Sequence, residues 1–407
     1  MKVLIADKFE QSGIDGLTAL GALVISEPGL KDEALTKAIA QHDPEVLIVR
    51  STKVTAADLD AGKSLALVIR AGAGTNTIDV KRASALGIFV ANCPGKNSVA
   101  VAELTMGLIL ALDRRIVDGT ADLRAGKWAK KEYSKARGLK GRTLGIIGMG
   151  QIGQEVARRA RAFDMRVVAW SRSLTDAIAE DWDVERGASV KDVAQQADVL
   201  TVHLAVTAET TGIIDAAIFD AMPADSMFIN TGRGELVASG ALAHAAKRGI
   251  RLGLDVFEQE PGASDEAFGD PIVKAESVVY GTHHIGASTD QAQEAVAAEA
   301  VRIVAVYKGA GRVENCVNLS AETPATHLLV VRHRDEPGVL AHVLNEISHA
   351  GINVEEMENV ILAGAEAACA RIRLKGALSE EVLAKIAKGN AKILGLSLVA
   401  LETAKGA

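Results

Sequence analysis

A glycine-rich loop at residues 148–153, Gly-Met-Gly-Gln-Ile-Gly, constrains the fold more than any other segment of the chain. The loop follows the apolar run 144–147 and precedes the helical pattern 154–163. In such a unit the first glycine permits a tight turn, the second admits a pyrophosphate to the backbone, and the third allows close helix–strand packing. The pattern therefore predicts a dinucleotide site at Gly148, Gly150, Gln151, Ile152 and Gly153, with the phosphates at the helix N-terminus.

Short apolar runs alternate with helical patterns on both sides of this loop, which is the rhythm of βαβ units. One series lies before it, at residues 3–6, 46–49, 65–69 and 88–90. A second series lies at residues 143–147, 167–170, 199–202, 227–229, 252–254 and 278–280. Alanine-rich helices are expected at 98–116 and 290–307; if the second packs back on the first domain, that domain is discontinuous. We expect an α/β fold of two doubly wound parallel-sheet domains, a flavodoxin-like domain of residues 1–97 and 287–318 and a Rossmann domain of residues 98–286.

Composition agrees with this fold class and excludes several functions. The chain is 48% hydrophobic and only 3% aromatic, which favours the aliphatic cores of buried parallel strands. The net charge of -7 gives no overall attraction to nucleic acid or to an anionic membrane. Three scattered cysteines, with no histidine cluster at metal spacing, predict a reducing compartment and no metal site. No run is apolar enough for a signal peptide or a membrane span, so we expect a soluble, cytoplasmic protein.

The end of the second strand of the Rossmann domain leaves the cofactor open between NAD and NADP. An acidic residue normally stands there to hold the ribose 2′-hydroxyl, whereas this chain has Ser171 and Arg172. An arginine with hydroxyl groups can pair with a 2′-phosphate, which favours NADP. Alternatively, Arg172 is a solvated loop charge and the protein uses NAD without an acidic clamp.

Three polar segments, residues 230–234, 254–261 and 283–289, follow later strands of the same domain. Doubly wound sheets place ligands at this edge, so the segments bring Arg233, Glu260 and His284 to one rim. Hydride transfer between a 2-hydroxy acid and nicotinamide needs a cation to hold the carboxylate and a proton acceptor for the hydroxyl. Histidine suits the second task, and a hydrogen-bonded carboxylate would orient it.

With these segments in this order, the chain resembles the D-isomer-specific 2-hydroxyacid dehydrogenases from Met1 to about Asn318. The resemblance implies that Arg233 holds the substrate, Glu260 is the partner carboxylate and His284 is the acid/base. It also implies further cofactor contacts at Thr231, Asp255 and His203.

Two features resemble the phosphoglycerate dehydrogenase type in particular: residues 49–54 and the basic stretch 126–131, although charge runs are usually solvated faces. The loop at residues 70–76 resembles the family's substrate-carboxylate loop, whose exposed amides form an anion nest. The resemblance implies a substrate site built from Arg50, Lys53, Arg70, Ala73, Gly74, Asn97 and, from a neighbouring subunit, Lys131. The implied reaction is oxidation of 3-phospho-D-glycerate to 3-phosphohydroxypyruvate in L-serine synthesis. Two alternatives remain: a glyoxylate or hydroxypyruvate reductase, and a dinucleotide-binding sensor or co-repressor with little turnover.

The C-terminal region forms a separate unit after a linker at residues 314–324. Its strand–helix–strand–strand–helix–strand pattern predicts a ferredoxin-like module over residues 325–407. Residues 331–340 and 351–354 resemble the ACT module, which implies regulation by L-serine or another amino acid through His333 and Asp335 on an exposed loop and Asn353 at the next strand. The alternative is a module that only joins subunits, and the resemblance implies a homodimer or homotetramer.

Overall fold

The structure of the protein is a computed structural model that describes residues 1–261, 267–275, 277–320 and 323–401. It divides into two compact units, Met1–Asn318 and Leu319–Ala407. Across the described residues, no helix combines the length and the hydropathy needed to cross a membrane.

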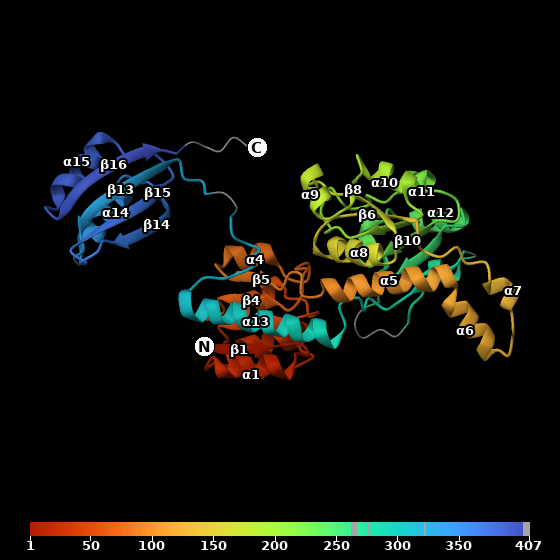
Figure 1. The fold of residues 1–407 in the computed structure, drawn as a ribbon. Helices are drawn as coiled ribbons and strands as arrows, with labels where there is room; N and C mark the ends of the chain where they lie inside the picture. Colours follow the sequence, from red (N-terminus) through yellow and green to blue (C-terminus); the bar gives the residue numbers. More distant parts are fainter. Residues whose placement is uncertain (262–266, 276, 321–322, 402–407) are drawn as a thin grey trace. The chain divides into compact units, whose positions relative to one another are not determined.

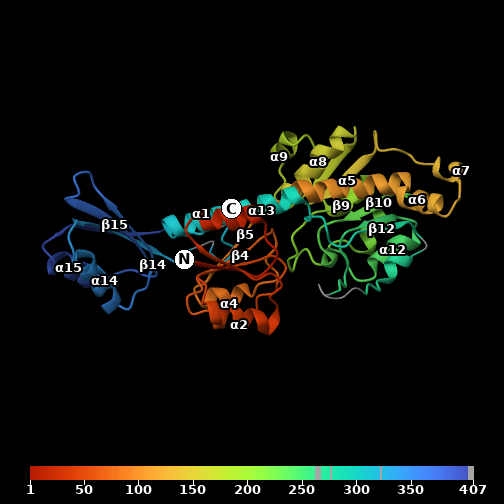
Figure 2. The same ribbon diagram turned by 90° about the horizontal axis from the view of Figure 1, so that it is seen from below.

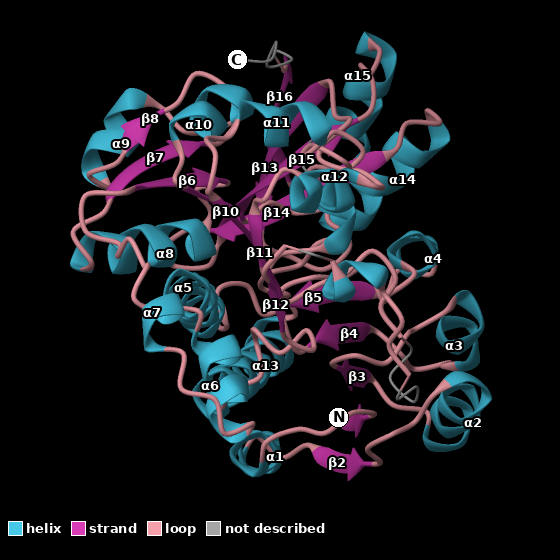
Figure 3. Ribbon diagram, turned by 90° about the vertical axis from the view of Figure 1, so that its right-hand side faces the viewer, coloured by secondary structure: helices cyan, strands magenta, loops and turns pink. Residues whose placement is uncertain are grey.

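The first sheet of the larger unit has five parallel strands (Figure 3). They are β1 (Lys2–Ile5), β2 (Leu23–Ser26), β3 (Val46–Val49), β4 (Leu67–Arg70) and β5 (Phe89–Asn92). Their order, β2-β1-β3-β4-β5, is the flavodoxin-like order. The predicted fold class is therefore confirmed, with β2 as a strand that the sequence analysis missed.

Helices cover both faces of this sheet (Figure 2). One face carries α2 (Asp32–His42), α3 (Ala56–Ala61) and α4 (Val80–Ala85), and the other carries α1 (Gln11–Ala19) and α13 (Asp290–Ala310). Ala300, Ile303 and Val304 of α13 share a core with Val3 and Ile5 of β1. The core on this face of the sheet is therefore built from residues at both ends of the larger unit.

The sequence analysis expected a linker from residue 314 onward, but the structure holds the first residues of this segment against the larger unit. The Val317 amide donates to the Val90 carbonyl over 2.8 Å, and the Val90 amide donates to Asn318 Oδ1 over 2.8 Å. Residues 315–318 thus run beside β5. The prediction was wrong here because backbone and asparagine hydrogen bonds hold this segment, and they leave no apolar period in the sequence.

The second sheet has seven parallel strands in the order β12-β11-β10-β9-β6-β7-β8. They are β6 (Thr143–Ile147), β7 (Arg166–Trp170), β8 (Glu185–Arg186), β9 (Val199–Val202), β10 (Met227–Asn230), β11 (Arg251–Leu254) and β12 (Val279–Gly281). The chain reverses its direction of winding between β6 and β9, where Rossmann folds place a dinucleotide. This fold prediction is also confirmed.

Two helical layers enclose this second sheet. The long helix α5 (Ser98–Arg114) runs along one face with α8 and α9 (Figure 1). The bounds of the remaining helices are α8 (Gln151–Ala162), α9 (Asp176–Asp181), α10 (Val190–Gln196), α11 (Ala216–Ala221) and α12 (Ala241–Lys247). The last three cover the opposite face. Two short 3-10 turns, Gly234–Leu236 and Pro271–Lys274, complete this half of the unit.

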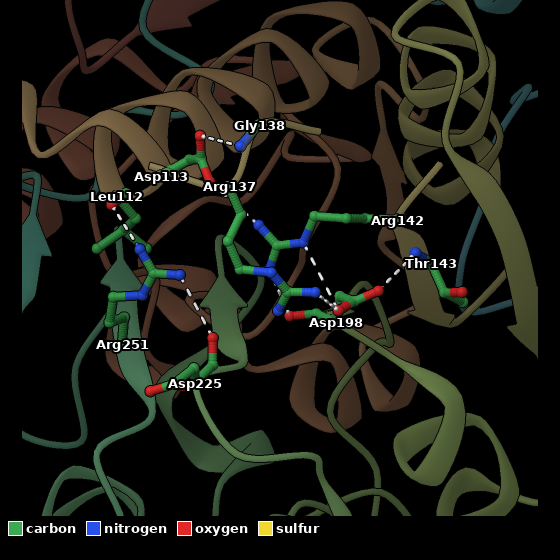
Figure 4. A network of polar contacts seen from close by, with 9 residues as sticks. All are labelled: Leu112, Asp113, Arg137, Gly138, Arg142, Thr143, Asp198, Asp225 and Arg251. Carbon is green, nitrogen blue, oxygen red and sulfur yellow. Dashed lines mark hydrogen bonds and ion pairs between the residues drawn. The ribbon is translucent and has the colours of Figure 1, made fainter. Parts of the chain in front are cut away.

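A buried ion pair fastens α5 to the amino ends of the second sheet (Figure 4). Arg142 Nη1 donates to Asp113 Oδ1 over 3.1 Å, and both side chains are nearly inaccessible to solvent. Asp198 accepts from the Thr143 amide over 3.0 Å and from Arg137 over 3.1 Å. The network therefore joins the end of α5 to the starts of β6 and β9, at the edge opposite the predicted cofactor site.

An arm leaves and returns at this network. It contains α6 (Ile116–Arg124) and α7 (Lys130–Tyr133), and neither helix has a buried residue. Ile116, Val117, Leu123 and Trp128 are exposed, with Trp128 81% exposed. In the described part of the chain, none of the hydrophobic cores of the larger unit includes a residue of this arm.

The smaller unit is a four-stranded antiparallel sheet with two helices. Its elements are β13 (His327–Arg334), α14 (Val339–His349), β14 (Val354–Ile361), β15 (Ala367–Leu374), α15 (Glu380–Gly389) and β16 (Ile393–Ala400). The strand order β14-β15-β13-β16 and the βαββαβ sequence match the ferredoxin-like prediction, which is confirmed. Its own core packs Leu329, Val331 and Ile372 against Val343 and Ile386.

Candidate active site

The glycine loop has the geometry that a dinucleotide requires. Gly148 has φ +106, and a Cβ atom there would lie 2.4 Å from the His203 carbonyl oxygen. A Cβ atom on Gly153 would lie 2.1 Å from the Gly148 carbonyl oxygen, whereas Gly150 has no atom within 4 Å of that position. Gly150 also precedes α8 without a side-chain cap. The first amides of α8 thus stand beside open space, which fits a pyrophosphate.

His203 lies directly after β9, beside the loop. Its Nε2 pairs with Thr201 Oγ1 over 3.0 Å, and its buried Nδ1 has no hydrogen-bond partner. Burial lowers the pKa of His203 to about 3, so the ring is neutral at physiological pH. An unpartnered ring nitrogen at this position fits a ligand that offers one further hydrogen bond.

At the adenosine end, the structure adds an acidic residue that the sequence analysis did not consider. Ser171 is half-buried and Arg172 is exposed after β7. A hydrogen bond from the Thr207 hydroxyl, with a contribution from the charge of Arg172, lowers the pKa of Glu209. Arg172 therefore shares this edge with a carboxylate from the loop after β9, which no pattern around residue 171 could indicate.

The structure brings the three predicted catalytic side chains together. Glu260 Oε2 lies 2.7 Å from His284 Nδ1, and Glu260 Oε1 accepts from the Phe257 amide over 3.1 Å. Burial acts to raise the pKa of Glu260, but the hydrogen bond and charge of His284, the Phe257 amide and the charge of Arg233 together lower it. Glu260 is therefore an ionised partner for the imidazole.

The loop that carries His284 is held in an unusual backbone conformation. His284 has φ +54, in the left-handed region. Asp255, 1% exposed, holds the loop: its Oδ1 accepts from the Ile285 amide over 2.9 Å and its Oδ2 from the Gly286 amide over 2.8 Å. The Thr282 hydroxyl also donates to Oδ1 over 2.5 Å. The structure thus places Asp255 under this loop, with three of its acceptor positions used.

The turn after β10 presents Arg233. Asn230 Oδ1 accepts from the Gly232 amide over 3.0 Å, and Asn230 Nδ2 donates to the Arg233 carbonyl over 2.8 Å. Thr231 is buried and its hydroxyl pairs with Thr105 of α5 over 2.9 Å. A cofactor contact at Thr231 would therefore come from its backbone.

Arg233 belongs to a group of three arginines. A Cβ atom on Gly74 would lie 3.0 Å from Arg233 Nη2, so the loop after β4 reaches the catalytic turn. Burial, then the charges of Arg233 and Arg50, lowers the pKa of Arg70 to about 10, and Arg70 Nε has no hydrogen-bond partner. We call Arg50, Arg70 and Arg233 the arginine cluster. Its mutual repulsion and its unpartnered donor are features of a site for an anion.

The remaining predicted substrate residues divide into two groups. Ala73 lies in the loop after β4, where its carbonyl accepts from Asn92 over 2.5 Å, and Asn97 precedes α5 with a buried, unpartnered Oδ1. Lys53 and Lys131 are exposed, and Lys131 lies on α7 in the arm. The structure thus places Ala73 in the loop that reaches Arg233, Asn97 at the start of α5, and the two lysines on the surface.

Two residues near the cluster were missed. Asp7 accepts from the amides of residues 50–52, and Gln293 of α13 accepts from Arg50 over 2.5 Å. A cavity of about 810 Å³ elsewhere in this half is lined by Val237, Leu242 and Phe257 among others, and Arg233, Glu260 and His284 do not line it. No group of three or more His, Cys, Asp and Glu side chains in the described part of the chain is arranged to hold a metal ion.

One predicted effector residue is misplaced by the sequence analysis. His333 does not lie on an exposed loop: it is 1% exposed, inside β13. Its Nδ1 pairs with the Arg334 carbonyl over 2.7 Å and its Nε2 with Asn359 over 3.2 Å. The strand continues to Arg334, and its alternation directs residue 333 inward. Asp335 is half-buried in the turn that follows, and Asn353 is exposed just before β14.

Comparisons with known proteins agree with this geometry. Residues 106–286 match the family described as "D-isomer specific 2-hydroxyacid dehydrogenase, NAD binding domain". The D-3-phosphoglycerate dehydrogenase of Methanocaldococcus jannaschii is 35% identical over 97% of this chain and 74% of its own length. The hydroxypyruvate reductase of Thermotoga maritima is 39% identical over 74% of this chain and 96% of its own length.

A solved structure is similar as well. The NAD+-bound 3-phosphoglycerate dehydrogenase of Entamoeba histolytica has a TM-score of 0.64 and 25% identity, over 78% of this chain and 99% of that protein. The chain spans 60% of the length of several other D-3-phosphoglycerate dehydrogenases, including that of Archaeoglobus fulgidus.

Proposed function

The chain belongs to the D-isomer-specific 2-hydroxyacid dehydrogenases, a family of NAD-dependent enzymes, and from that premise we propose that it is a D-3-phosphoglycerate dehydrogenase. It would oxidise 3-phospho-D-glycerate to 3-phosphohydroxypyruvate, in L-serine synthesis. The arginine cluster carries this proposal. A substrate with a carboxylate and a phosphate supplies negative charge that balances the three neighbouring guanidinium groups.

The residues divide the chemistry between them. Nδ1 of His284 is held by Glu260, which leaves Nε2 to take the proton of the substrate hydroxyl. The ionised Glu260 then stabilises the imidazolium that results. Arg233 holds the carboxylate and polarises the C2–O bond. Bound NAD supplies the acceptor for the hydride that leaves C2.

A substrate panel tests this assignment. Nicotinamide absorbance is followed with 3-phosphohydroxypyruvate, hydroxypyruvate and glyoxylate, at equal concentrations. We expect the highest kcat/KM with the phosphorylated substrate, and His284→Asn should reduce kcat while the cofactor Kd stays unchanged. A preference for glyoxylate would contradict the proposal, and cofactor binding without turnover of any substrate would favour a sensor or co-repressor.

A second candidate is a hydroxypyruvate reductase. It is favoured by the 39% identity to the Thermotoga maritima enzyme over almost all of that protein. This identity extends over 305 residues, 74% of the present chain. A kcat/KM for hydroxypyruvate above that for its phosphorylated form would select this candidate.

We propose that the cofactor preference depends on Arg172. Its exposed guanidinium can reach a 2′-phosphate, while Glu209 at the same edge favours the uncharged hydroxyl of NAD. If NADP is preferred, Arg172→Asp should weaken NADP binding and spare NAD binding. Equal changes in both dissociation constants would remove Arg172 from cofactor selection.

We further propose that the smaller unit is an ACT regulatory domain. Asp335, which is half-buried, and Asn353, which is exposed, would contact an amino acid, whereas the buried His333 would act by holding Asn359. Calorimetry of the full chain with L-serine tests this role, and no heat with L-serine or related amino acids would favour a module that only joins subunits.

The arm supports a homodimer or homotetramer. Four exposed apolar side chains on a segment with no buried residue are typical of a surface that a second copy covers. Light scattering should therefore give a multimer whose mass falls in Trp128→Ser. The free cysteines Cys93, Cys316 and Cys369 favour a reducing compartment such as the cytoplasm.

A further inference from the structure

Asp7 is a carboxylate that the proposed chemistry does not use, and its contacts are unusual. Its Oδ2 accepts from three consecutive amides: Arg50 at 2.6 Å, Ser51 at 3.1 Å and Thr52 at 3.1 Å. Its Oδ1 accepts from the Ser51 hydroxyl over 3.0 Å. All four donors belong to the loop after β3, so one side chain sets the path of that loop.

The topology explains this contact. Asp7 follows β1 and Arg50 follows β3, and these strands are neighbours in the parallel sheet. Arg70 ends β4, the next strand. The carboxyl ends of three adjacent strands thus carry Asp7, Arg50 and Arg70 at one edge, which places Asp7 beside two members of the arginine cluster.

The Arg50 guanidinium is fixed from the other side. Its Nη1 donates to Gln293 Oε1 over 2.5 Å, from the first turns of α13. Asp7 therefore holds the backbone of residue 50 and Gln293 holds its side-chain end. A long arginine side chain held at both ends loses little conformational entropy when it binds an anion.

The negative charge of Asp7 also affects the arginine cluster, although its carboxylate oxygens already accept hydrogen bonds from the loop after β3. Asp7 is close enough to Arg70 that its charge partly offsets the lowering of the Arg70 pKa. Within the described ranges, Asp7 forms no ion pair with an arginine, because its oxygens are taken by the loop amides. It thus counterbalances the cluster without competing for the guanidinium groups.

We propose that Asp7 is a positioning residue that holds Arg50 for the substrate phosphate and so sets the preference for phosphorylated over unphosphorylated 2-hydroxy acids. This inference rests on the proposed function. It is separate from the acid/base chemistry of His284, because Asp7 hydrogen-bonds to residues 50–52, whereas His284 pairs with Glu260.

Two variants of the full-length chain separate position from charge. Asp7→Ala removes every contact with the loop. In Asp7→Asn the amide oxygen can still accept from the backbone amides, and the amide nitrogen can donate to the Ser51 hydroxyl oxygen. If Asp7→Ala does not fold, Asp7→Ser, whose hydroxyl is too short to reach all three amides, replaces it. Arg50→Met, which removes the phosphate contact itself, is the comparison variant.

The first measurement is amide hydrogen exchange of the peptide containing residues 50–52. Asp7→Ala should exchange faster than the wild type, and Asp7→Asn should remain close to it. Unchanged exchange in Asp7→Ala would overturn the positioning role whatever the substrate proves to be.

The second measurement is steady-state kinetics with 3-phosphohydroxypyruvate and hydroxypyruvate. We expect Asp7→Ala to raise KM for the phosphorylated substrate by roughly tenfold, the scale of a misplaced charge-assisted contact, with kcat nearly unchanged. KM for hydroxypyruvate should change by less than about twofold, and Asp7→Asn should restore most of the preference. Equal losses with both substrates would overturn the specificity role.

The two failures are distinguishable. If the wild type does not prefer the phosphorylated substrate and Arg50→Met has no effect on it, the proposed function fails and the specificity role of Asp7 fails with it. If Arg50→Met abolishes the preference while Asp7→Ala keeps it, the proposed function stands and only the inference about Asp7 is wrong.

Discussion

The partly buried charge of Arg70 should lower the stability of the ligand-free protein, although the proposed binding of the substrate anion needs that charge. Arg70 lies partly buried beside two other arginines, with an unpartnered Nε, and its pKa falls from the ordinary arginine value to about 10. A drop of this size means that folding disfavours the charged guanidinium by roughly 3 kcal/mol. Since the folded pKa lies below the unfolded one, this cost is fully present at neutral pH and declines only as the pH rises above about 10.

Arg70→Met removes the charge and keeps an unbranched apolar stem. The lost packing of the guanidinium against Gly72 offsets part of the gain. We therefore expect the free energy of unfolding of the ligand-free protein to increase by about 1–2 kcal/mol. At the same time, KM for 3-phosphohydroxypyruvate should rise, because one of the anion's donors is gone.

Urea denaturation at pH 7, with and without inorganic phosphate, measures both effects. Phosphate should stabilise the wild type by mass action and stabilise Arg70→Met much less. Arg312→Met is the matched control, because Arg312 is exposed after α13, and its stability should change by less than about 0.5 kcal/mol. A ligand-free Arg70→Met protein that is less stable than the wild type would refute the argument.

Three further outcomes are expected. Glu260→Gln should lower kcat for oxidation by about tenfold or more with an unchanged NAD Kd, because the imidazolium of His284 loses an ionic partner; kinetics and cofactor titration check this, and an unchanged kcat would contradict it. Hydrogen bonds, above all from Arg302, lower the pKa of Glu299 to about 2. This contact should therefore contribute roughly 3 kcal/mol to the free energy of unfolding above pH 4.5, and the contribution should be lost as the pH falls towards 2. In Glu299→Gln, the free energy of unfolding measured by acid unfolding should lack this dependence on pH. Asp113→Ala removes the nearer of the two carboxylates that pair with the buried Arg142 and leaves Asp198 at 3.7 Å, so it should lower the free energy of unfolding by about 3 kcal/mol, with a smaller loss in the double variant that also carries Arg142→Met.

The sequence predicted the central strands of both parallel sheets because they are buried on two faces and appear as continuous apolar runs. It missed β2 and β8, which lie at sheet edges. Leu23 and Ser26 at the ends of β2 are exposed, and β8 has only two residues, Glu185 and Arg186, both exposed. Without burial on two faces, neither strand leaves an apolar run.

The candidate site was predictable where one short segment contains the signal. Arg233, Glu260 and His284 each stand in a recognisable turn after a strand. Asp7 and Gln293 could not be assigned, because their contacts with Arg50 depend on the pairing of β1 with β3 and on the return of α13. His333 was misjudged because it was expected on the exposed loop after the strand, whereas β13 continues to Arg334.

The return of α13 also sets an order of events during synthesis. Ala300, Ile303 and Val304 complete the core over β1, yet they leave the ribosome nearly three hundred residues after Val3. All the strands of the second sheet emerge before them, so that sheet can form while one face of the first is covered by α1 alone. A chain that has emerged from the ribosome only as far as residue 289 would therefore have a complete second sheet next to an amino-terminal sheet whose apolar strands are partly exposed to chaperones and proteases.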